Sequence, residues 1–518
     1  MIHIVKVPLR VSPKEYKILK ARFNAAHSLD NAVKGEGLHR LTRYRSSPEF
    51  VKGKDLLKSN NNCTKELDNE ISGLFSIART KSGYYLRSAS KYGKDDSLQQ
   101  YAYKYVRKSW IADHLDSTSC ITIADRVFAS LETKRKNWKN GKVRFKSKIN
   151  PVRSIRGKEN SCLKWKNHQL VWNTKLHELT LNPGMDLTKD EKYKSILKDP
   201  KIVKYVTIIR KMINGVWKYS AIITCEGSPI VKSKHKLGKG EIGIDLGTST
   251  FGYVADKYAK LSLLCQEIDV NEDKIKKLQR VISRQQRLNN SDKYEPDFYD
   301  KFGRKKKGKV KKGAKNFEAS KRQQVNYDKL AELKRKQAEY RRCLHGKEAN
   351  EIRSHGNYLK IENTQKKGWQ KLWGKSVGNR APAMFETILK NKFLATNGKV
   401  LEINTFVNKG SQRCPNCGNI FKKELKDRLH QCDKCGYTMQ REMASSIIAK
   451  ATDDTSVVNA RKAKKLCKDK DPVLRAALKR LTQSSSDEQL RNHFGLKKSE
   501  LEKIACENGV KIGDGACF

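Results

Sequence analysis

Two Cys-x-x-Cys pairs, each followed directly by glycine, place the strongest constraint on what this chain can fold into. The first pair is Cys414 and Cys417 and the second is Cys432 and Cys435, with fourteen residues between the pairs. In such a knuckle the glycine turn lets backbone amides face the thiolates, and two knuckles complete a tetrahedral zinc site. Four protein ligands leave no open position on the metal, so the sequence predicts one structural zinc ion in a ribbon over 408–436.

A large excess of positive charge indicates a polyanionic partner. The 518 residues include 110 Lys and Arg against 55 Asp and Glu, which gives a formal net charge of +55. The basic residues recur along the chain rather than in one tail, which favours an extended binding channel. Nucleic acid is therefore the expected partner, although a solvated basic surface like that of ribosomal proteins would give the same composition.

We expect nucleic-acid contacts from basic and aromatic side chains in several segments. They are Lys142, Arg144, Lys146, Lys148, Arg210, Trp217, Arg284, Arg287, Arg304, Lys305, Lys306, Lys307 and Lys375. The connection 303–315 is too rich in Lys, Arg and Gly to form a core, so we expect it to be a mobile or RNA-contacting loop.

The sequence indicates a soluble intracellular protein with no membrane partner. The N-terminal apolar residues are too few for the core of a signal peptide, and no run approaches about 18 apolar residues. The cysteines outside the two pairs are scattered, which is typical of free thiols in a reducing compartment.

The first 236 residues begin with a strand pattern, continue with helical spacing and end with short strands. Residues 2–10 alternate as a strand, and 16–138 mostly follow helical spacing. Short strands broken by Gly, Asn and Pro then occupy 139–236, which suggests a small β-barrel. We expect the first strand to close that barrel, so that 1–15 and 139–236 form one domain and the helical block is an insertion in it.

A strand around Asp245 opens the second half of the chain. The apolar residues of 242–246 alternate with small and acidic ones, so Asp245 should lie on the face opposite the isoleucines. Two more strands after tight turns should complete an antiparallel trio. Long charged helices over about 272–289 and 317–344 precede a strand that ends at Glu362.

Three acidic side chains on separate elements can hold a pair of divalent metal ions, which is how polymerases and nucleases cut phosphodiesters. The candidates are Asp245, Glu362 and Glu442, the last of which follows the second cysteine pair. Gly-Ile-Asp-Leu-Gly also occurs in sugar kinases and actin-like proteins, where the aspartate and glycines contact a nucleotide phosphate. The large net charge and the cysteine pairs of this chain disfavour a small-molecule kinase. Glu362 taken alone would more often be a solvated carboxylate at the end of a strand.

The order of these motifs resembles the RuvC-type nuclease module of the TnpB proteins and of compact type V CRISPR effectors. The shared features are Gly-Ile-Asp245-Leu-Gly, an Arg- and Gln-rich helix from Leu278 to Arg287, Ile361-Glu362, Gly410-Ser411-Gln412-Arg413-Cys414-Pro-x-Cys-Gly, and Cys435-Gly436-Tyr437 before Arg441-Glu442. The resemblance covers about residues 200–450 well and is looser over the N-terminal third.

This resemblance implies a multidomain α+β fold. A wedge-like β-barrel with a helical recognition insertion would precede a ribonuclease H-like RuvC domain, into which the zinc ribbon is inserted. The RuvC domain would span 237–407 and 437–455, and a helical extension of unknown role would span 456–518.

The resemblance also implies the partners and cofactors of the chain. They are a guide RNA, double-stranded target DNA and two catalytic Mg²⁺ ions bound by Asp245, Glu362 and Glu442. The protein would act in the cytoplasm of a prokaryote or, if phage-encoded, of the host. The sequence leaves open whether the chain acts as a monomer or a homodimer.

One acid departs from the family pattern. The family has Asp-Arg-Asp-x-Asn-Ala-Ala where this chain has Gln440-Arg441-Glu442-Met443-Ala444-Ser445-Ser446. Glutamate keeps the charge but is one methylene longer, and a misplacement of about 1 Å can lower a rate on the order of a hundredfold. Two functions therefore stay open, namely an RNA-guided DNA endonuclease and an RNA-guided protein that binds DNA without cutting it. A DNA transposase also uses an acidic triad, but the ribbon between the second and third acids disfavours it.

Overall fold

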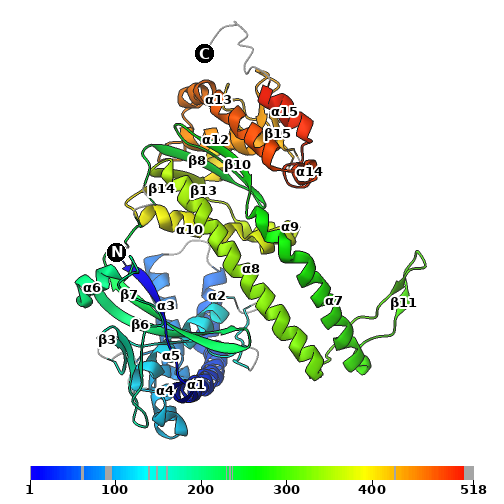
Figure 1. Cartoon of the computed structure of the whole chain (residues 1–518). Coiled ribbons are helices and arrows are strands. Elements are labelled where there is room, and N and C mark those ends of the chain that lie inside the picture. The colour runs from blue at the N-terminus through cyan, green and yellow to red at the C-terminus, as the bar shows by residue number, and fades with distance from the viewer. Residues whose placement is uncertain are drawn as a thin grey trace. The chain divides into compact units, whose positions relative to one another are not determined.

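The computed structural model describes residues 2–59, 64–87, 96–137, 141–147, 150–158, 161–228, 230–232, 235, 237–424 and 427–506. Lys148, one of the expected nucleic-acid contacts, lies outside these residues. The chain divides into two compact units, Met1–Ile230 and Val231–Phe518, each described by itself below (Figure 1). Among the described helices, none has the length and apolar composition that crossing a membrane requires.

Strands of the first unit form two antiparallel sheets. The larger sheet has the order β1 (Ile2–Pro8), β7 (Val216–Glu226), β6 (Val203–Ile213) and β2 (Ser154–Arg156), and the smaller contains β3 (Leu163–Lys166), β4 (Gln169–Trp172) and β5 (Thr180–Leu181). β1 pairs with β7 along its whole length, so the first strand joins strands that follow the helical block. Pairing among the described strands gives two open sheets and does not close them into the expected barrel.

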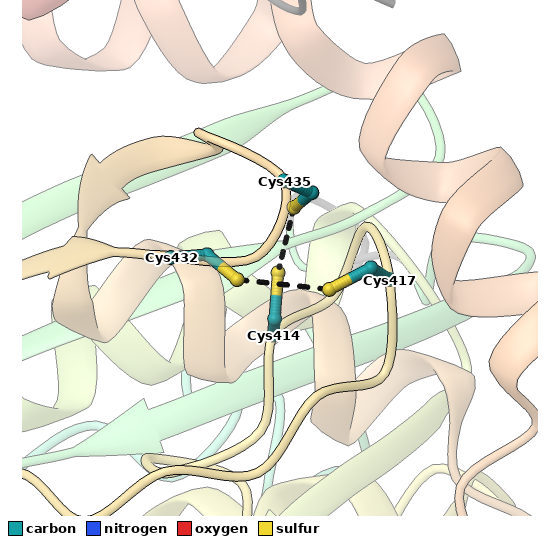
Figure 2. Close-up of side chains that lie close together, drawn as sticks. All are labelled: Cys414, Cys417, Cys432 and Cys435. Atoms are coloured by element: carbon teal, nitrogen blue, oxygen red, sulfur yellow. Dashed lines mark hydrogen bonds between the residues drawn. The ribbon is translucent and has the colours of Figure 1, made fainter. Parts of the chain in front are cut away.

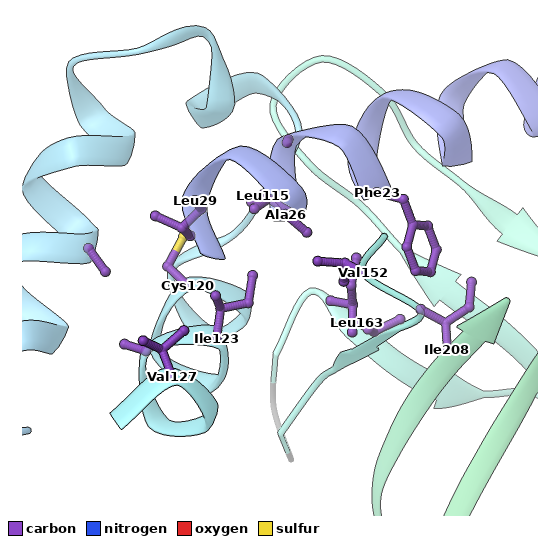
Figure 3. Close-up of a cluster of buried hydrophobic side chains, with 14 of the residues drawn as sticks. Phe23, Ala26, Leu29, Leu115, Cys120, Ile123, Val127, Val152, Leu163 and Ile208 are labelled. Atoms are coloured by element: carbon purple, nitrogen blue, oxygen red, sulfur yellow. The ribbon is translucent and has the colours of Figure 1, made fainter. Parts of the chain in front are cut away.

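Helices of the first unit lie mainly between β1 and β2 in the sequence. They are α1 (Pro13–Ser46), α2 (Pro48–Ser59), α3 (Lys65–Ser82), α4 (Leu98–Arg107) and α5 (Ser117–Lys136), with η2 (Trp110–Asp113), α6 (Lys194–Lys198) and η3 (Pro200–Ile202). α1 begins at a capping box in which Ser12 and Glu15 exchange hydrogen bonds between side chain and backbone. Apolar side chains of α1 and α5, among them Leu29 and Ile123, share one core with Ile208 of β6 (Figure 3).

A five-stranded sheet with the order β10-β9-β8-β13-β14 organises the second unit. Its strands are β8 (Glu241–Leu246), β9 (Thr250–Val254), β10 (Ala259–Leu263), β13 (Tyr358–Glu362) and β14 (Lys399–Ile403). β8, β9 and β10 pair antiparallel, as the sequence predicted, while β13 lies parallel to both β8 and β14. The carboxyl ends of β8 and β13 are therefore neighbours at one edge of the sheet.

The two faces of this sheet are covered by different helices. The isoleucines of β8 pack against α8 (Lys321–Ser354) and α10 (Pro382–Leu394). Gly243 and Asp245 lie on the other face, against α12 (Arg441–Ala451). Asp245 is thus opposite the isoleucines, which confirms the expectation from the alternating pattern.

A β-hairpin connects α7 (Glu272–Asn289) to α8. Its strands are β11 (Phe298–Tyr299) and β12 (Lys305–Lys306), and η4 (Gln266–Asn271) and η5 (Ser291–Lys293) lie on either side of α7 in the sequence. We expected a mobile or RNA-contacting loop over 303–315; the structure has the short paired strand β12 within it, and the contact with RNA stays a prediction. Backbone pairing needs no apolar core, and for that reason the composition did not reveal it.

The remaining elements of the second unit surround the cysteine pairs. They are α9 (Lys366–Arg380), α11 (Thr405–Asn408), β15 (Leu429–Gln431), β16 (Thr438–Gln440), α13 (Ala460–Ser484), α14 (Asp487–Phe494) and α15 (Lys498–Cys506). α13, α14 and α15 form the extension to which the sequence assigned no role. Their apolar side chains share one core with α12, Cys414 and Cys432. The extension is therefore part of the packing around the cysteines.

Gly243→Ala should lower the thermal stability of the second unit. An added methyl group would lie less than 3.0 Å from the carbonyl oxygen of Ser446 and the amide nitrogen of Lys450, both backbone atoms of α12. Overpacking of this kind costs about 1–3 kcal/mol. Gly346→Ala in α8 is the matched control, because its methyl group would meet no atom within 4 Å. Thermal unfolding followed by circular dichroism should give a lower midpoint for the first variant alone, and equal midpoints would contradict the close packing of α12.

Candidate functional site

Four cysteine sulfurs converge from two turns of the chain (Figure 2). The Sγ atoms of Cys414 and Cys435 are 3.7 Å apart, those of Cys417 and Cys432 are 3.6 Å apart, and all four lie within 4.8 Å of one another. A tetrahedral zinc ion with Zn–S bonds of about 2.3 Å holds its sulfurs about 3.8 Å apart. The cluster therefore fits zinc, and the two predicted pairs do come together.

Backbone hydrogen bonds shape the two knuckles in the same way. The N–H of Gly418 donates to the carbonyl of Cys414 at 2.9 Å, and the N–H of Gly436 donates to that of Cys432 at 2.8 Å. Both glycines have positive φ angles, +75° and +67°, which side chains disfavour. Burial raises the pKa of the Cys414 thiol, and two backbone N–H groups of the same knuckle oppose this rise. Such N–H groups stabilise a thiolate, the form that binds a metal.

We predict about one zinc ion per chain, held by these four cysteines. Cys417→Ser should reduce the zinc content and lower the unfolding midpoint, because a structural zinc contributes to folding. Cys343→Ser, at an exposed cysteine of α8, is the matched control and should change neither quantity. Metal analysis by inductively coupled plasma mass spectrometry gives the measurement. Wild-type protein purified without chelator that contains no zinc would rule the site out.

Asp245 and Glu362 occupy matching positions on neighbouring parallel strands. The register between β8 and β13 runs to Ile244 opposite Ile361, so the two acids are the next residue on each strand. Adjacent strands lie about 4.8 Å apart, and residues in register point to the same face. Both carboxyl groups therefore belong to the face that α12 covers.

α12 is fixed to this face at its middle and at its carboxyl end. Ser446 Oγ donates to the carbonyl of Gly252 at 2.8 Å and accepts the backbone N–H of Asp245 at 3.2 Å. Near the carboxyl end of the helix, the buried Lys360 Nζ donates to the carbonyl of Thr452 at 2.7 Å. A lysine at this end also favours the helix dipole.

Repulsion between carboxylates characterises this edge of the sheet. Burial, followed by the charges of Glu362 and Glu442, raises the pKa of Asp245 well above its usual range, and Arg441 opposes the rise. Burial likewise raises the pKa of Glu362, against the effects of Arg441 and Lys366. Crowded carboxylates on rigid elements are an oxygen ligand set that divalent cations favour.

Glu362 also lies against the loop that leads into the first knuckle. A Cβ atom at Gly410 would be less than 3.0 Å from Glu362 Oε1 and from Asn408 Oδ1. Asn408 is buried and donates through Nδ2 to Thr452 Oγ1 at 2.6 Å, while its Oδ1 has no hydrogen-bond partner among the described residues. A carboxylate oxygen and an unpartnered amide oxygen thus lie beside the same glycine, an arrangement suited to a cation.

Glu442 is 2% exposed and its carboxylate is engaged within the protein. Arg428 Nη1 donates to Oε1 at 3.0 Å, Thr250 Oγ1 donates to the same oxygen at 3.3 Å, and Gln440 Nε2 donates to Oε2. Of the described His, Cys, Asp and Glu residues, only the four cysteines form a group of three or more with all ligand atoms within 4.8 Å. The structure thus brings Asp245 and Glu362 together, with Glu442 near enough to affect Asp245 but bound to Arg428.

The expected nucleic-acid contacts fall into different settings. Lys142, Arg144, Arg284, Arg304, Lys305, Lys306, Lys307 and Lys375 are exposed, and Lys146 and Trp217 are half-buried. Arg210 is 6% exposed, contrary to our expectation of a surface contact, since its Nε donates to the carbonyl of Val152 at 2.9 Å and its guanidinium stacks on Phe23. Arg287 is half-buried and donates to the carbonyl of Gly308 at 2.7 Å. Both arginines thus support the fold.

Several residues at these sites were not identified from the sequence. A groove of 490 Å³ along α7 is lined by Lys276, Gln279, Arg280, Ser283, Arg284 and Lys307, of which only Arg284 and Lys307 were expected from the sequence. The spacing of four residues from Lys276 to Arg280 and from Arg280 to Arg284 could have revealed this stripe. No sequence signal marks Arg428 or Asn408, because they meet the acids only after distant segments fold together.

Comparisons with known proteins point to one family. Residues 383–448, which include the four cysteines and Glu442, match the family model described as Cas12f1-like, TNB domain. A search of curated proteins found no match.

The solved structures that this chain resembles include several CRISPR effectors. A Cas12f1–sgRNA–target DNA complex is 12% identical with a TM-score of 0.40, covering 87% of this chain and 98% of that chain. A CRISPR-Cas12f ternary complex is 12% identical with a TM-score of 0.28, covering 86% and 98%. A Cas12i–crRNA–dsDNA complex is 12% identical with a TM-score of 0.25, covering 87% and 70%.

The family match is the stronger of these findings, because it falls on the segment whose cysteines converge. It confirms the resemblance that the order of the sequence motifs indicated. The chain is similar to the compact type V CRISPR effectors, and its residues 383–448 carry a Cas12f1-like TNB domain.

Proposed function

We propose that this chain is an RNA-guided DNA endonuclease with a RuvC-type two-metal site. A guide RNA pairs with target DNA beside a short flanking motif, and Asp245, Glu362 and Glu442 hold two Mg²⁺ ions in a ribonuclease H-like domain. One observation carries the proposal: Asp245 and Glu362 are side by side on parallel strands, and Glu362 lies against Gly410, within the segment that matches the Cas12f1-like TNB model.

The donor set at this edge fits magnesium. Mg²⁺ binds carboxylate oxygens while keeping several waters, and when bound it supplies Lewis acidity for phosphodiester hydrolysis. Burial raises the pKa of both carboxyl groups, and the negative charges of Glu362 and Glu442 raise that of Asp245 further. A divalent cation relieves that repulsion. Arg441 opposes the rise in pKa at both acids, and Lys366 opposes it at Glu362.

The proposed partners are a guide RNA and double-stranded DNA. The net charge of +55 supports a large polyanion, and the exposed basic residues of α7 and its hairpin supply part of the binding surface. Similar structures are named as complexes with sgRNA and target DNA or with crRNA and dsDNA. We extend these partners to this chain, acting in the cytoplasm of a prokaryote or of a phage host.

A second function, RNA-guided DNA binding without cleavage, is favoured by the setting of Glu442. Its carboxylate is bound by Arg428, Thr250 and Gln440 rather than gathered with the other two acids. The same position is where the chain departs from the aspartate of the family it resembles. A protein of this kind would block its target by occupancy.

Asp245→Asn and Glu362→Gln should abolish DNA cutting and leave RNA-guided DNA binding intact. Each change removes an anionic metal ligand, so we expect the cutting rate to fall by more than about a hundredfold. The assays are cleavage of labelled matched DNA in Mg²⁺ and a gel shift, both with the chain assembled on guide RNA. Glu402→Gln, at an exposed carboxylate of β14 that pairs with Lys390, is the control and should cut normally. Undiminished cutting by Asp245→Asn would show that this acid is not a metal ligand.

Substitutions at position 442 distinguish the two candidate functions. If Glu442 is a working ligand, Glu442→Gln should lose cutting, because the amide lacks the negative charge. If glutamate weakens the site, Glu442→Asp should cut faster than wild type, because the shorter side chain restores the family's geometry. Single-turnover rates in Mg²⁺ and in Mn²⁺ give the comparison. A wild-type complex that binds but never cuts, and that Glu442→Asp does not restore, would leave only the binding function.

A further inference from the structure

The hairpin between α7 and α8 ends in a turn that is fixed by hydrogen bonds. The carboxylate of Asp300 accepts the backbone N–H groups of Phe302 and Arg304, each at 2.9 Å, and its carbonyl accepts the N–H of Gly303 at 2.9 Å. Gly303 has a φ of +70°, a conformation that glycine adopts readily. Phe302 therefore projects from an ordered turn rather than from a loose loop.

Three aromatic rings of this hairpin are exposed to solvent. The exposed fractions are 49% for Phe298, 71% for Tyr299 and 67% for Phe302. Phe298 pairs with Lys306 and Tyr299 pairs with Lys305, so each face of the hairpin carries one ring beside one lysine. Clustered exposed apolar groups on one element mark a binding surface.

Positive charge surrounds these rings. Lys301 Nζ lies 5.0 Å from the centroid of the Phe302 ring. The segment 301–307 contains five cations, while the nearby acids Asp297 and Asp300 pair with two of them. The tip therefore combines flat apolar rings with a net positive charge, which complements bases and phosphates.

The hairpin is anchored where it leaves the helices. Arg287 donates to the carbonyl of Gly308 at 2.7 Å, and the buried Asn290 accepts the N–H of Glu318 at 2.6 Å. Figure 1 shows the hairpin projecting from the end of α7 and α8 that is remote from the sheet. The basic groove along α7 includes Lys307, so positive charge continues from the helix into the hairpin.

We propose that Phe298, Tyr299 and Phe302 stack on unpaired bases of the RNA that the chain binds. The proposal rests on the RNA-guided function and adds a contact to it. Folded RNA displays unpaired bases in loops and bulges, whereas duplex DNA keeps its bases stacked until it is melted. RNA therefore offers unpaired bases to the aromatic rings of the hairpin and phosphates to its basic side chains, and no duplex has to be melted first.

The test compares the triple variant Phe298→Ala/Tyr299→Ala/Phe302→Ala with the wild-type chain. The probes are fluorescein-labelled oligo(A) RNA of about 20 nucleotides, long enough for such sites, and a fully paired RNA duplex of the same length. Fluorescence anisotropy at several KCl concentrations gives the Kd and its salt dependence. The triple variant keeps its basic side chains, so the Kd for oligo(A) should rise about tenfold at every salt concentration, with duplex binding unchanged.

Three further variants serve as controls. Phe298→Tyr/Phe302→Tyr keeps the rings and should bind oligo(A) like the wild type, which separates ring loss from misfolding. Tyr340→Ala removes a ring of α8 that is 42% exposed and should leave both Kd values unchanged. Lys305→Ala/Lys306→Ala should instead reduce the salt slope, by about one for each phosphate that the variant no longer neutralises.

Several outcomes would overturn the proposal. An unchanged Kd for oligo(A) in the triple variant would do so, as would an equal loss on the RNA duplex. A labelled single-stranded oligo(dA) DNA of the same length is the third probe, and weakening confined to it would assign the rings to DNA instead. A wild-type dimer that becomes a monomer in the triple variant, with normal RNA binding, would assign them to a second copy of the chain. None of these measurements depends on DNA cutting, so the nuclease function can fail while the stacking surface stands.

Discussion

The close approach of α12 to β8 and β9 determines the arrangement of the second unit. Two glycines permit it, since a side chain at Gly243 would strike the backbone of α12 and one at Gly252 would crowd Glu442. Ser446 then bridges the helix to both strands, and Lys360 holds the far end of the helix. Because Glu442 lies in the first turn of this helix, the same packing sets the distance of the third acid from the other two.

Charge balance at the acid edge follows from that packing. Asp245 and Glu362 would repel each other strongly in a neutral surrounding, and burial adds to the cost of ionising them. Arg441, which stands directly before Glu442 in the chain, opposes both effects. Arg428 pairs with Glu442 from the ribbon, so the metal-binding segment also supplies a cation to the acids. The two candidate metal centres are thus linked through side chains of one short segment.

Local patterns predicted much of the second unit. The alternation of residues around Asp245 predicted the strand and the face on which its carboxyl group lies. The spacing of the cysteines predicted a cluster, and the four sulfurs do converge in the structure. Glu362 could be predicted as a metal ligand only from its position in the order of motifs that the family shares. Nothing in the neighbouring sequence distinguishes it from a solvated glutamate. Its proximity to Asp245 comes from parallel strand pairing across more than a hundred residues, which no local pattern encodes.

Other features were beyond such patterns for identifiable reasons. We expected Arg210 to contact nucleic acid because its side chain is charged, but this side chain is buried. The carbonyl of Val152 and the ring of Phe23 offset the cost of burying the charge. The hairpin was not predicted because one of its two short strands is Lys305–Lys306 and backbone hydrogen bonds, rather than an apolar core, hold the strands together. The sequence suggested a small barrel because several short strands with turn signals follow one another, and that pattern does not specify whether the edges of a sheet meet.

The helices that follow α12 have a consequence for anyone who wishes to make this chain smaller. α13, α14 and α15 share one hydrophobic core with the buried Cys414 and Cys432, so the last stretch of the described chain belongs to the packing around these two thiols. Trimming the coding sequence from its 3′ end, the simplest way to fit a gene into a size-limited carrier, would uncover those sulfurs and admit oxidants to them. A shorter variant is better made by deleting an exposed segment within the chain than by removing its C-terminal helices.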